Sequence, residues 1–121
     1  MPARQLTGRC LCGAVRYSVS GRPRSPAVCH CEDCRRQSGS AFSVFFIVRD
    51  DELALTGELA TYVTTGEDTG LRRERRFCPA CGSPVLSRLE EMPGMTFLKA
   101  DTLDDGDRVR PAIEFYRSSA Q

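Results

Sequence analysis

The residues with the clearest chemical capacity in this sequence are its seven cysteines, which fall into three tight groups. The groups are Cys10-Leu11-Cys12, Cys29-His30-Cys31-Glu32-Asp33-Cys34 and Cys78-Pro79-Ala80-Cys81. Disulfides within these groups are disfavoured, because an extended C-x-C pair lacks the Cβ approach that a bridge requires and the total is odd. A C-x-x-C turn instead offers two thiolates from one bend to a tetrahedral zinc ion. The spacing therefore predicts metal binding.

The three groups divide most economically into two zinc sites. The C-x-x-C pair is only half of a tetrahedral site, and the central group already holds three thiolates within six residues. We therefore expect one site made by Cys10, Cys12, Cys78 and Cys81, and a second made by Cys29, Cys31 and Cys34. Four thiolates saturate a structural zinc, whereas three leave a position for water or substrate, as in catalytic zinc sites.

Alternatives to this division exist for both sites. The central group is also compatible with a second structural zinc completed by His30, Glu32, Asp33 or a distant acid. His30 is a poor candidate, because in an extended Cys-His-Cys stretch its side chain faces away from both neighbours. A redox role for the C-x-x-C pair is disfavoured, since no thioredoxin-like βαβ pattern surrounds it.

The elements that must position these cysteines are mostly strands. Residues 14–20 alternate apolar and polar side chains, and residues 42–48 form an apolar run rich in aromatic and β-branched residues. A short helical turn is expected over Glu32–Gln37. Further short strands, separated by Gly, Pro and Asp-rich turns, are predicted at 53–56, 60–64, 71–77, 84–89, 95–100 and 113–116. The predicted fold class is all-β.

Length and composition narrow the range of functions. The 121 residues suit one domain, and 17 basic against 16 acidic side chains give no large cationic excess for nucleic acid. The basic run at residues 72–76 is interrupted by Glu74 and is expected to be a solvated strand face. No apolar stretch approaches the length of a membrane span, and no secretory signal opens the sequence, so a cytoplasmic location is expected.

The cysteine motifs and their flanking residues resemble those of the glutathione-dependent formaldehyde-activating enzyme family, which includes centromere protein V. The matching stretches are Gly8-Arg9-Cys10-Leu11-Cys12-Gly13, Cys29-His30-Cys31-x-x-Cys34, Phe77-Cys78-x-x-Cys81-Gly82 and Thr102-Leu103-Asp104-Asp105. The resemblance spans about residues 6–116 and implies a single domain over 1–121 with a small zinc-binding β-tent (Mss4-like) fold. Residues 117–121 are expected to fray.

The resemblance also implies an activity. Family members join formaldehyde to the thiol of glutathione, a carbon–sulfur lyase reaction, with a structural zinc on the outer cysteine pairs and a catalytic zinc on the central trio. The implied partners are a small thiol such as glutathione and an aldehyde, with neither nucleic acid nor membrane. Arg35 or Arg36, beside the trio, is a candidate to steer a carboxylate of the thiol.

Two departures from the family pattern concern the substrate pocket rather than the metal sites. Glu114 stands where the family commonly has His, and the sequence has no Trp. Two other functions therefore remain open: a zinc-stabilised binding module without catalysis, and a redox- or metal-responsive protein that releases zinc on oxidation.

Overall fold

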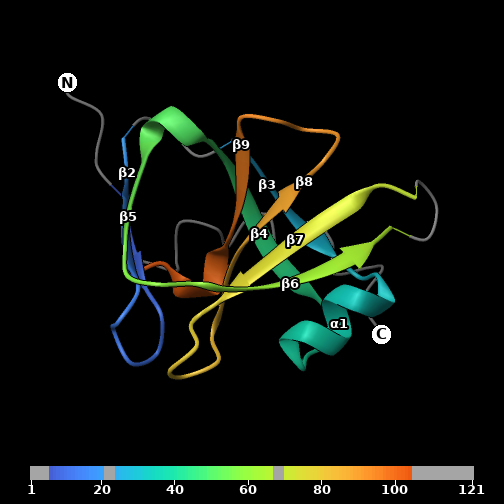
Figure 1. Ribbon diagram of the computed structural model, residues 1–121, viewed down its shortest axis with the longest axis horizontal. Helices are drawn as coiled ribbons and strands as arrows, with labels where there is room; N and C mark the ends of the chain where they lie inside the picture. The colour runs from blue at the N-terminus through green and yellow to red at the C-terminus, as the bar shows by residue number, and fades with distance from the viewer. Residues whose placement is uncertain (1–5, 21–23, 67–69, 105–121) are drawn as a thin grey trace.

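The computed structural model describes residues 6–20, 24–66 and 70–104, without the side chains of residues 24–26. These residues form two antiparallel sheets and one short α-helix (Figure 1). The smaller sheet has the order β1 (Leu6–Arg9), β2 (Arg16–Val19), β5 (Leu53–Thr56). The larger sheet has the order β3 (Arg24–Cys29), β4 (Ser43–Arg49), β9 (Met95–Lys99), β8 (Pro84–Leu89), β7 (Arg72–Phe77), β6 (Ala60–Thr65).

The expected β architecture is confirmed. Strands occur at every predicted position within the described residues, and the helical turn expected over Glu32–Gln37 is α1 (Glu32–Ser38). Two strands, β1 and β3, were not predicted; they pair with β2 and β4. The strand expected at 113–116, and Glu114 within it, lie outside the described residues.

The core lies between the two sheets and follows the pleat of the strands. Along β4, Val44, Phe46 and Val48 are buried, and β2 contributes Tyr17 and Val19 to the same apolar cluster. Successive side chains of a strand point to opposite faces, so the intervening residues of β4 lie on the other face of the larger sheet. Burial of each such side chain stabilises the fold by roughly 1.5–3 kcal/mol. The larger sheet thus has a core face and an opposite face.

The expectation that the basic residues 72–76 form a solvated strand face is wrong for Arg75, which lies on this opposite face of the sheet. Arg75 is buried, with 6% of its surface exposed, because its guanidinium lies under α1. It donates from Nη1 to Gln37 Oε1 (3.1 Å) and from Nε to Thr64 Oγ1 (3.1 Å). The expectation fits the neighbouring Arg72, which is exposed and pairs with Glu74 (3.5 Å).

Helix α1 begins and ends at residues suited to those positions. Cys31 is the N-cap, and its Sγ accepts the backbone N–H of Cys34 (3.3 Å). The acidic side chains of the first turn and the basic ones of the last turn complement the helix dipole. Gly39 ends the helix at φ 69°, a left-handed conformation that glycine adopts without strain. None of the described helices has the length and apolar character needed to cross a membrane.

Candidate metal centres and the adjoining cavity

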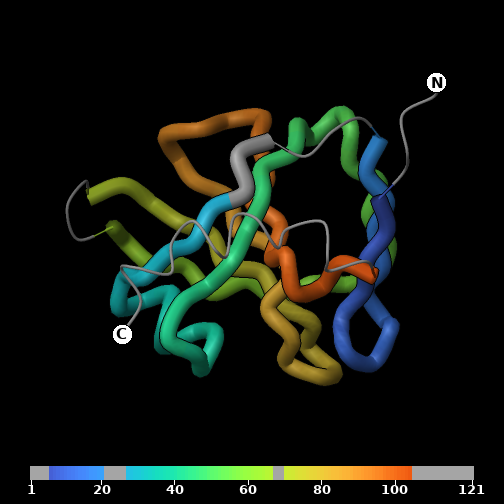
Figure 2. The backbone as a smooth tube through the Cα atoms, turned by 180° about the vertical axis from the view of Figure 1, so that it is seen from behind, coloured from blue at the N-terminus to red at the C-terminus, as the bar shows by residue number. Residues whose placement is uncertain are grey.

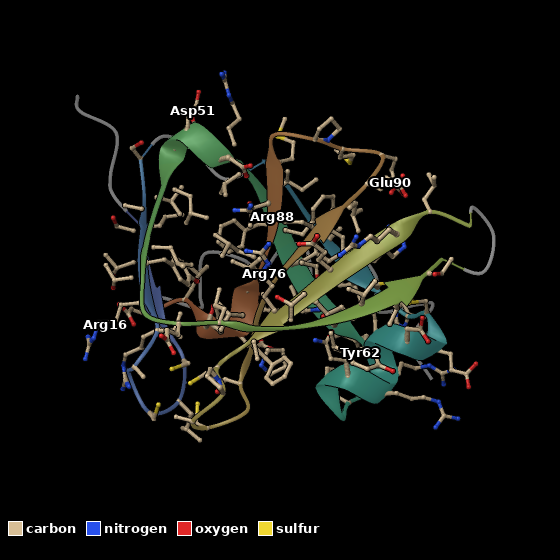
Figure 3. The ribbon with its side chains drawn as sticks, viewed as in Figure 1. Arg16, Asp51, Tyr62, Arg76, Arg88 and Glu90 are labelled. Carbon is tan, nitrogen blue, oxygen red and sulfur yellow. The ribbon has the colours of Figure 1, made fainter. Side chains whose placement is uncertain are left out.

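The outer cysteine cluster forms where two turns meet, the one between β1 and β2 and the one between β7 and β8. These turns lie side by side in both backbone views (Figures 1 and 2), and their sulfur atoms gather there in Figure 3. Cys12 Sγ lies 3.7 Å from both Cys10 Sγ and Cys78 Sγ, and with Cys81 all four sulfurs are within 4.8 Å of one another. Tetrahedral zinc with 2.3 Å bonds requires sulfurs about 3.8 Å apart. The donor set therefore fits zinc.

Two glycines give the turns their shared geometry. Gly13 and Gly82 both have φ 82°, which returns the chain so that each glycine N–H donates to a cysteine carbonyl, Cys10 O (3.1 Å) and Cys78 O (2.8 Å). The N–H of Val15 then reaches Cys10 Sγ (3.3 Å). Backbone N–H groups directed at sulfur favour the thiolate that a metal requires.

Ser83 joins the two turns through its hydroxyl. The Oγ accepts the N–H of Leu11 (3.0 Å) and lies 3.1 Å from Cys81 Sγ. This contact with Ser83 is the main reason that the pKa of Cys81 is lowered to about 5. Cys10 and Cys78 are buried, Cys81 is half-buried and Cys12 is exposed, so the cluster lies at the edge of the core.

The central trio lies where β3 passes into α1. Cys29 is the last residue of β3, Cys31 caps the helix and Cys34 lies in its first turn, and the three sulfurs are within 4.8 Å of one another. Within the described residues, no histidine or carboxylate joins this group at that distance. His30 instead packs against Phe42, with ring centroids 5.6 Å apart. The trio therefore offers three thiol ligands to a metal.

The electrostatics of the trio favour a thiolate at Cys34. Its pKa is lowered to about 5, mainly by a hydrogen bond with Cys29, against the opposing effect of burial. Arg75, whose Nη1 lies 3.8 Å from Cys34 Sγ, and the charge of Lys99 lower this pKa further. The pKa of Cys29 is raised in turn, because it shares its proton with Cys34. Three thiols close enough to share protons in this way suit a cation that displaces those protons.

A cavity of about 380 Å³ adjoins the trio but not the outer cluster. Its walls are the trio, the start of α1, and the face of the larger sheet opposite the core. The sheet residues and the residue after β6 that line it are Phe45, Gly66, Arg73, Arg75, Ser87, Leu89, Phe97 and Lys99, and α1 adds Glu32 and Asp33. The central site therefore has room for a small molecule beside its three sulfurs.

The cations of this cavity are not those expected from the sequence. Arg35 and Arg36 are exposed and do not line it, and Arg36 pairs with Glu32 (2.9 Å). The buried cations are instead Arg75 and Lys99, which come from strands distant in sequence. Burial lowers the pKa of Lys99, and the thiolates of the trio oppose that effect. The alternation of side chains along the strands puts Arg75 and Lys99 on one face of the sheet. That this face lies beside the trio depends on the order of the strands, which the sequence alone does not give.

Comparison with known proteins places the chain in a family. The family model of the glutathione-dependent formaldehyde-activating enzyme matches residues 5–119. The chain belongs to this family.

Other members of the glutathione-dependent formaldehyde-activating enzyme family share moderate identity with it. Relatives named for the same family occur in Halomonas elongata (33% identical over 110 residues, 88% of this chain and 69% of the relative) and Podospora anserina (26% over 118 residues, 93% and 54%). The chain thus spans about half to two thirds of the length of these relatives. A crystal structure of a Rhodobacter sphaeroides protein shares the fold, with a TM-score of 0.63, 24% identity and coverage of 81% of this chain and 87% of that one.

Proposed function

We propose that this member of the family adds a thiol, such as glutathione, to formaldehyde and catalyses the reverse cleavage, as a carbon–sulfur lyase. A bond forms between the thiol sulfur and the carbonyl carbon, and the thiol proton ends on the oxygen of the hydroxymethyl product. Nothing is oxidised or reduced. The observation that supports this proposal is that all three cysteines of the central group line a cavity of about 380 Å³ among the described residues.

In this proposal the two cysteine clusters bind one zinc ion each. Cys10, Cys12, Cys78 and Cys81 hold a structural ion, and Cys29, Cys31 and Cys34 hold the ion of the active site. When bound to three thiolates, zinc supplies a Lewis acid that retains a position for a thiol and lowers its pKa.

The residues around the trio suit an anionic sulfur. Zinc with three thiolates has a formal charge of about −1 by simple addition, and a further thiolate makes the group more negative. The buried charges of Arg75 and Lys99 lie beside the trio and offset this negative charge. Phe45 and Phe97, whose ring centroids are 5.3 Å apart, give the cavity an apolar wall.

The two non-catalytic alternatives have less support. A purely structural role for the central site requires a fourth protein ligand, and none lies within 4.8 Å among the described residues. A zinc-releasing sensor does not require a lined cavity next to its thiolates. The single domain over 1–121 and the cytoplasmic location remain predictions from the sequence.

The reaction can be followed directly by NMR exchange spectroscopy. Zinc-loaded protein is mixed with glutathione and formaldehyde, and the exchange rate between free thiol and adduct is compared with that in buffer and with free zinc. The expected result is exchange above both backgrounds, lost in Cys34→Ala and retained in Arg35→Gln. Background rates for the wild type across a panel of thiols would refute the proposal.

A further inference from the structure

Strand β6 is an exposed edge of the larger sheet (Figure 1). It pairs with β7 on one side, and no strand of the described residues pairs with it on the other. Its sequence, Ala-Thr-Tyr-Val-Thr-Thr, has no charge and no proline, and its pairing with β7 runs from end to end without a register shift. Tyr62 and Val63 have 65% and 44% of their surfaces exposed. Regular, uncharged edge strands of this kind readily pair with another strand.

The other three sheet edges are each protected in a way that β6 is not. The outer side of β1 is covered by the residues that follow β9, since Leu103 forms a bridge with Gly8 and the N–H of Asp104 donates to Thr7 O (3.0 Å). Strand β3 contains Pro26, which lacks an N–H, and its register with β4 shifts. Strand β5 has only four residues. Cover, proline, irregular pairing and short length all prevent edge pairing, so β6 is the open edge within the part of the chain that the structure describes.

The hydrogen bonds at the end of β6 show which of its backbone groups face outward. The N–H of Gly66, the residue after the strand, donates to Leu71 O (2.9 Å), on the side of β7. Backbone groups alternate in direction along an antiparallel strand, so those of every second residue before Gly66 also face β7. The N–H and C=O groups of the remaining residues, Thr61, Val63 and Thr65, therefore face away from the sheet.

These three residues are self-complementary about Val63. When two copies of β6 run antiparallel around a two-fold axis at this residue, Val63 lies opposite the partner's Val63, and Thr61 lies opposite the partner's Thr65. Each such pair exchanges two hydrogen bonds, which gives about six between the chains. On the other face of the strands, Tyr62 lies opposite the partner's Thr64. No like charges meet, and pairs of aromatic and β-branched side chains stabilise a sheet.

We propose that β6 is the interface of a homodimer, in which the larger sheets of two copies join edge to edge as one continuous antiparallel sheet. A two-fold interface uses the same strand on both copies, so the assembly closes at two chains. The interface also adjoins the cavity, because Gly66 lines it and Thr64 Oγ1 accepts a hydrogen bond from Arg75, which lines it too. The partner's Tyr62, opposite Thr64, would border the cavity. This inference goes beyond the proposed function and does not depend on it.

Sedimentation velocity of the reduced, zinc-loaded full chain tests the dimer. The sedimentation coefficient should rise from the monomer value to the dimer value between micromolar and millimolar protein, since a single pair of strands buries less surface than a standard interface and the association should be reversible. Val63→Lys places two like charges directly opposite each other and should weaken the dimer about 10-fold or more. Val63→Thr is the matched control, because it keeps a neutral β-branched side chain, and it should still dimerise.

Paired charges test the register. Thr61→Lys together with Thr65→Glu brings opposite charges together across the axis and should retain the dimer. Thr61→Lys together with Thr65→Lys brings like charges together and should weaken it. Both threonines are exposed, so neither pair of substitutions should affect folding. Equal association of the two double variants would overturn the proposed pairing.

Amide hydrogen exchange followed by NMR provides an independent measurement. The amides of Thr61, Val63 and Thr65 should exchange rapidly in dilute protein and become protected as the concentration rises, whereas those of Tyr62 and Thr64 should be protected throughout. A monomer at every concentration, or a dimer that Val63→Lys leaves intact, would overturn the inference. Protection of the three outward amides in the dilute monomer would also overturn it, because another segment of the same chain would then cover β6.

Discussion

Replacing Cys81 by serine is expected to destabilise the protein more than replacing Cys34 by serine. The two cysteines are matched, since both are half-buried and each belongs to one cluster. The outer cluster brings together Cys12 and Cys78, 66 residues apart, and closing a loop of that length contributes roughly 4 kcal/mol in the chain-entropy treatment of cross-links. The trio spans only residues 29–34, for which the same relation gives roughly 2 kcal/mol. The two variants should therefore differ by about 2 kcal/mol.

Urea unfolding of the reduced, zinc-loaded proteins measures this difference. Circular dichroism is the suitable signal, because the chain has no Trp. A zinc chelator should lower the free energy of unfolding of the wild type by at least about 4 kcal/mol, because metal binding contributes directly to folding. Equal destabilisation by Cys81→Ser and Cys34→Ser would refute the reasoning from loop length. Superimposable wild-type curves with and without chelator would refute the structural zinc itself.

Three further perturbations test individual contacts. Lys99→Met should raise the free energy of unfolding of the metal-free protein at pH 7. Burial lowers the pKa of Lys99 from 10.5, so the folded chain holds this proton less tightly than the unfolded chain does. The unfolding free energy of the wild type should then increase as the pH rises toward 10.5, and its difference from that of the variant should shrink. Urea unfolding of both proteins at two pH values measures this difference. Gly8→Ala should cost about 3 kcal/mol or more, since its Cβ would lie 2.3 Å from Tyr17 Cζ, whereas Gly39→Ala, with nothing within 4 Å, should cost about 1 kcal/mol in thermal unfolding. Ser83→Ala should cost about 1–2 kcal/mol and speed zinc transfer to a colorimetric chelator, because it removes the hydroxyl that joins the two cysteine turns.

The sequence predicted those features that depend on local spacing. Cysteine positions defined both clusters, and the alternation at residues 14–20 and the apolar run at 42–48 located β2 and β4. The cavity was not foreseen, because it depends on which strands are neighbours. Arg75 appeared to belong to an exposed basic run until its place under α1 was known, and nothing local in the sequence distinguishes it from Arg76. Such long-range pairings are what a single sequence specifies least directly.

The pleat of the larger sheet separates two kinds of evolutionary change. On the central strands, positions 75, 87, 97 and 99 line the cavity, whereas positions 86 and 98 pack in the core. Mutations at cavity positions 87 and 97, which lie outside the core cluster, can alter which small molecule is recognised while the core packing is kept. A combinatorial library randomised at those positions alone should therefore yield mostly folded variants with altered ligand preferences.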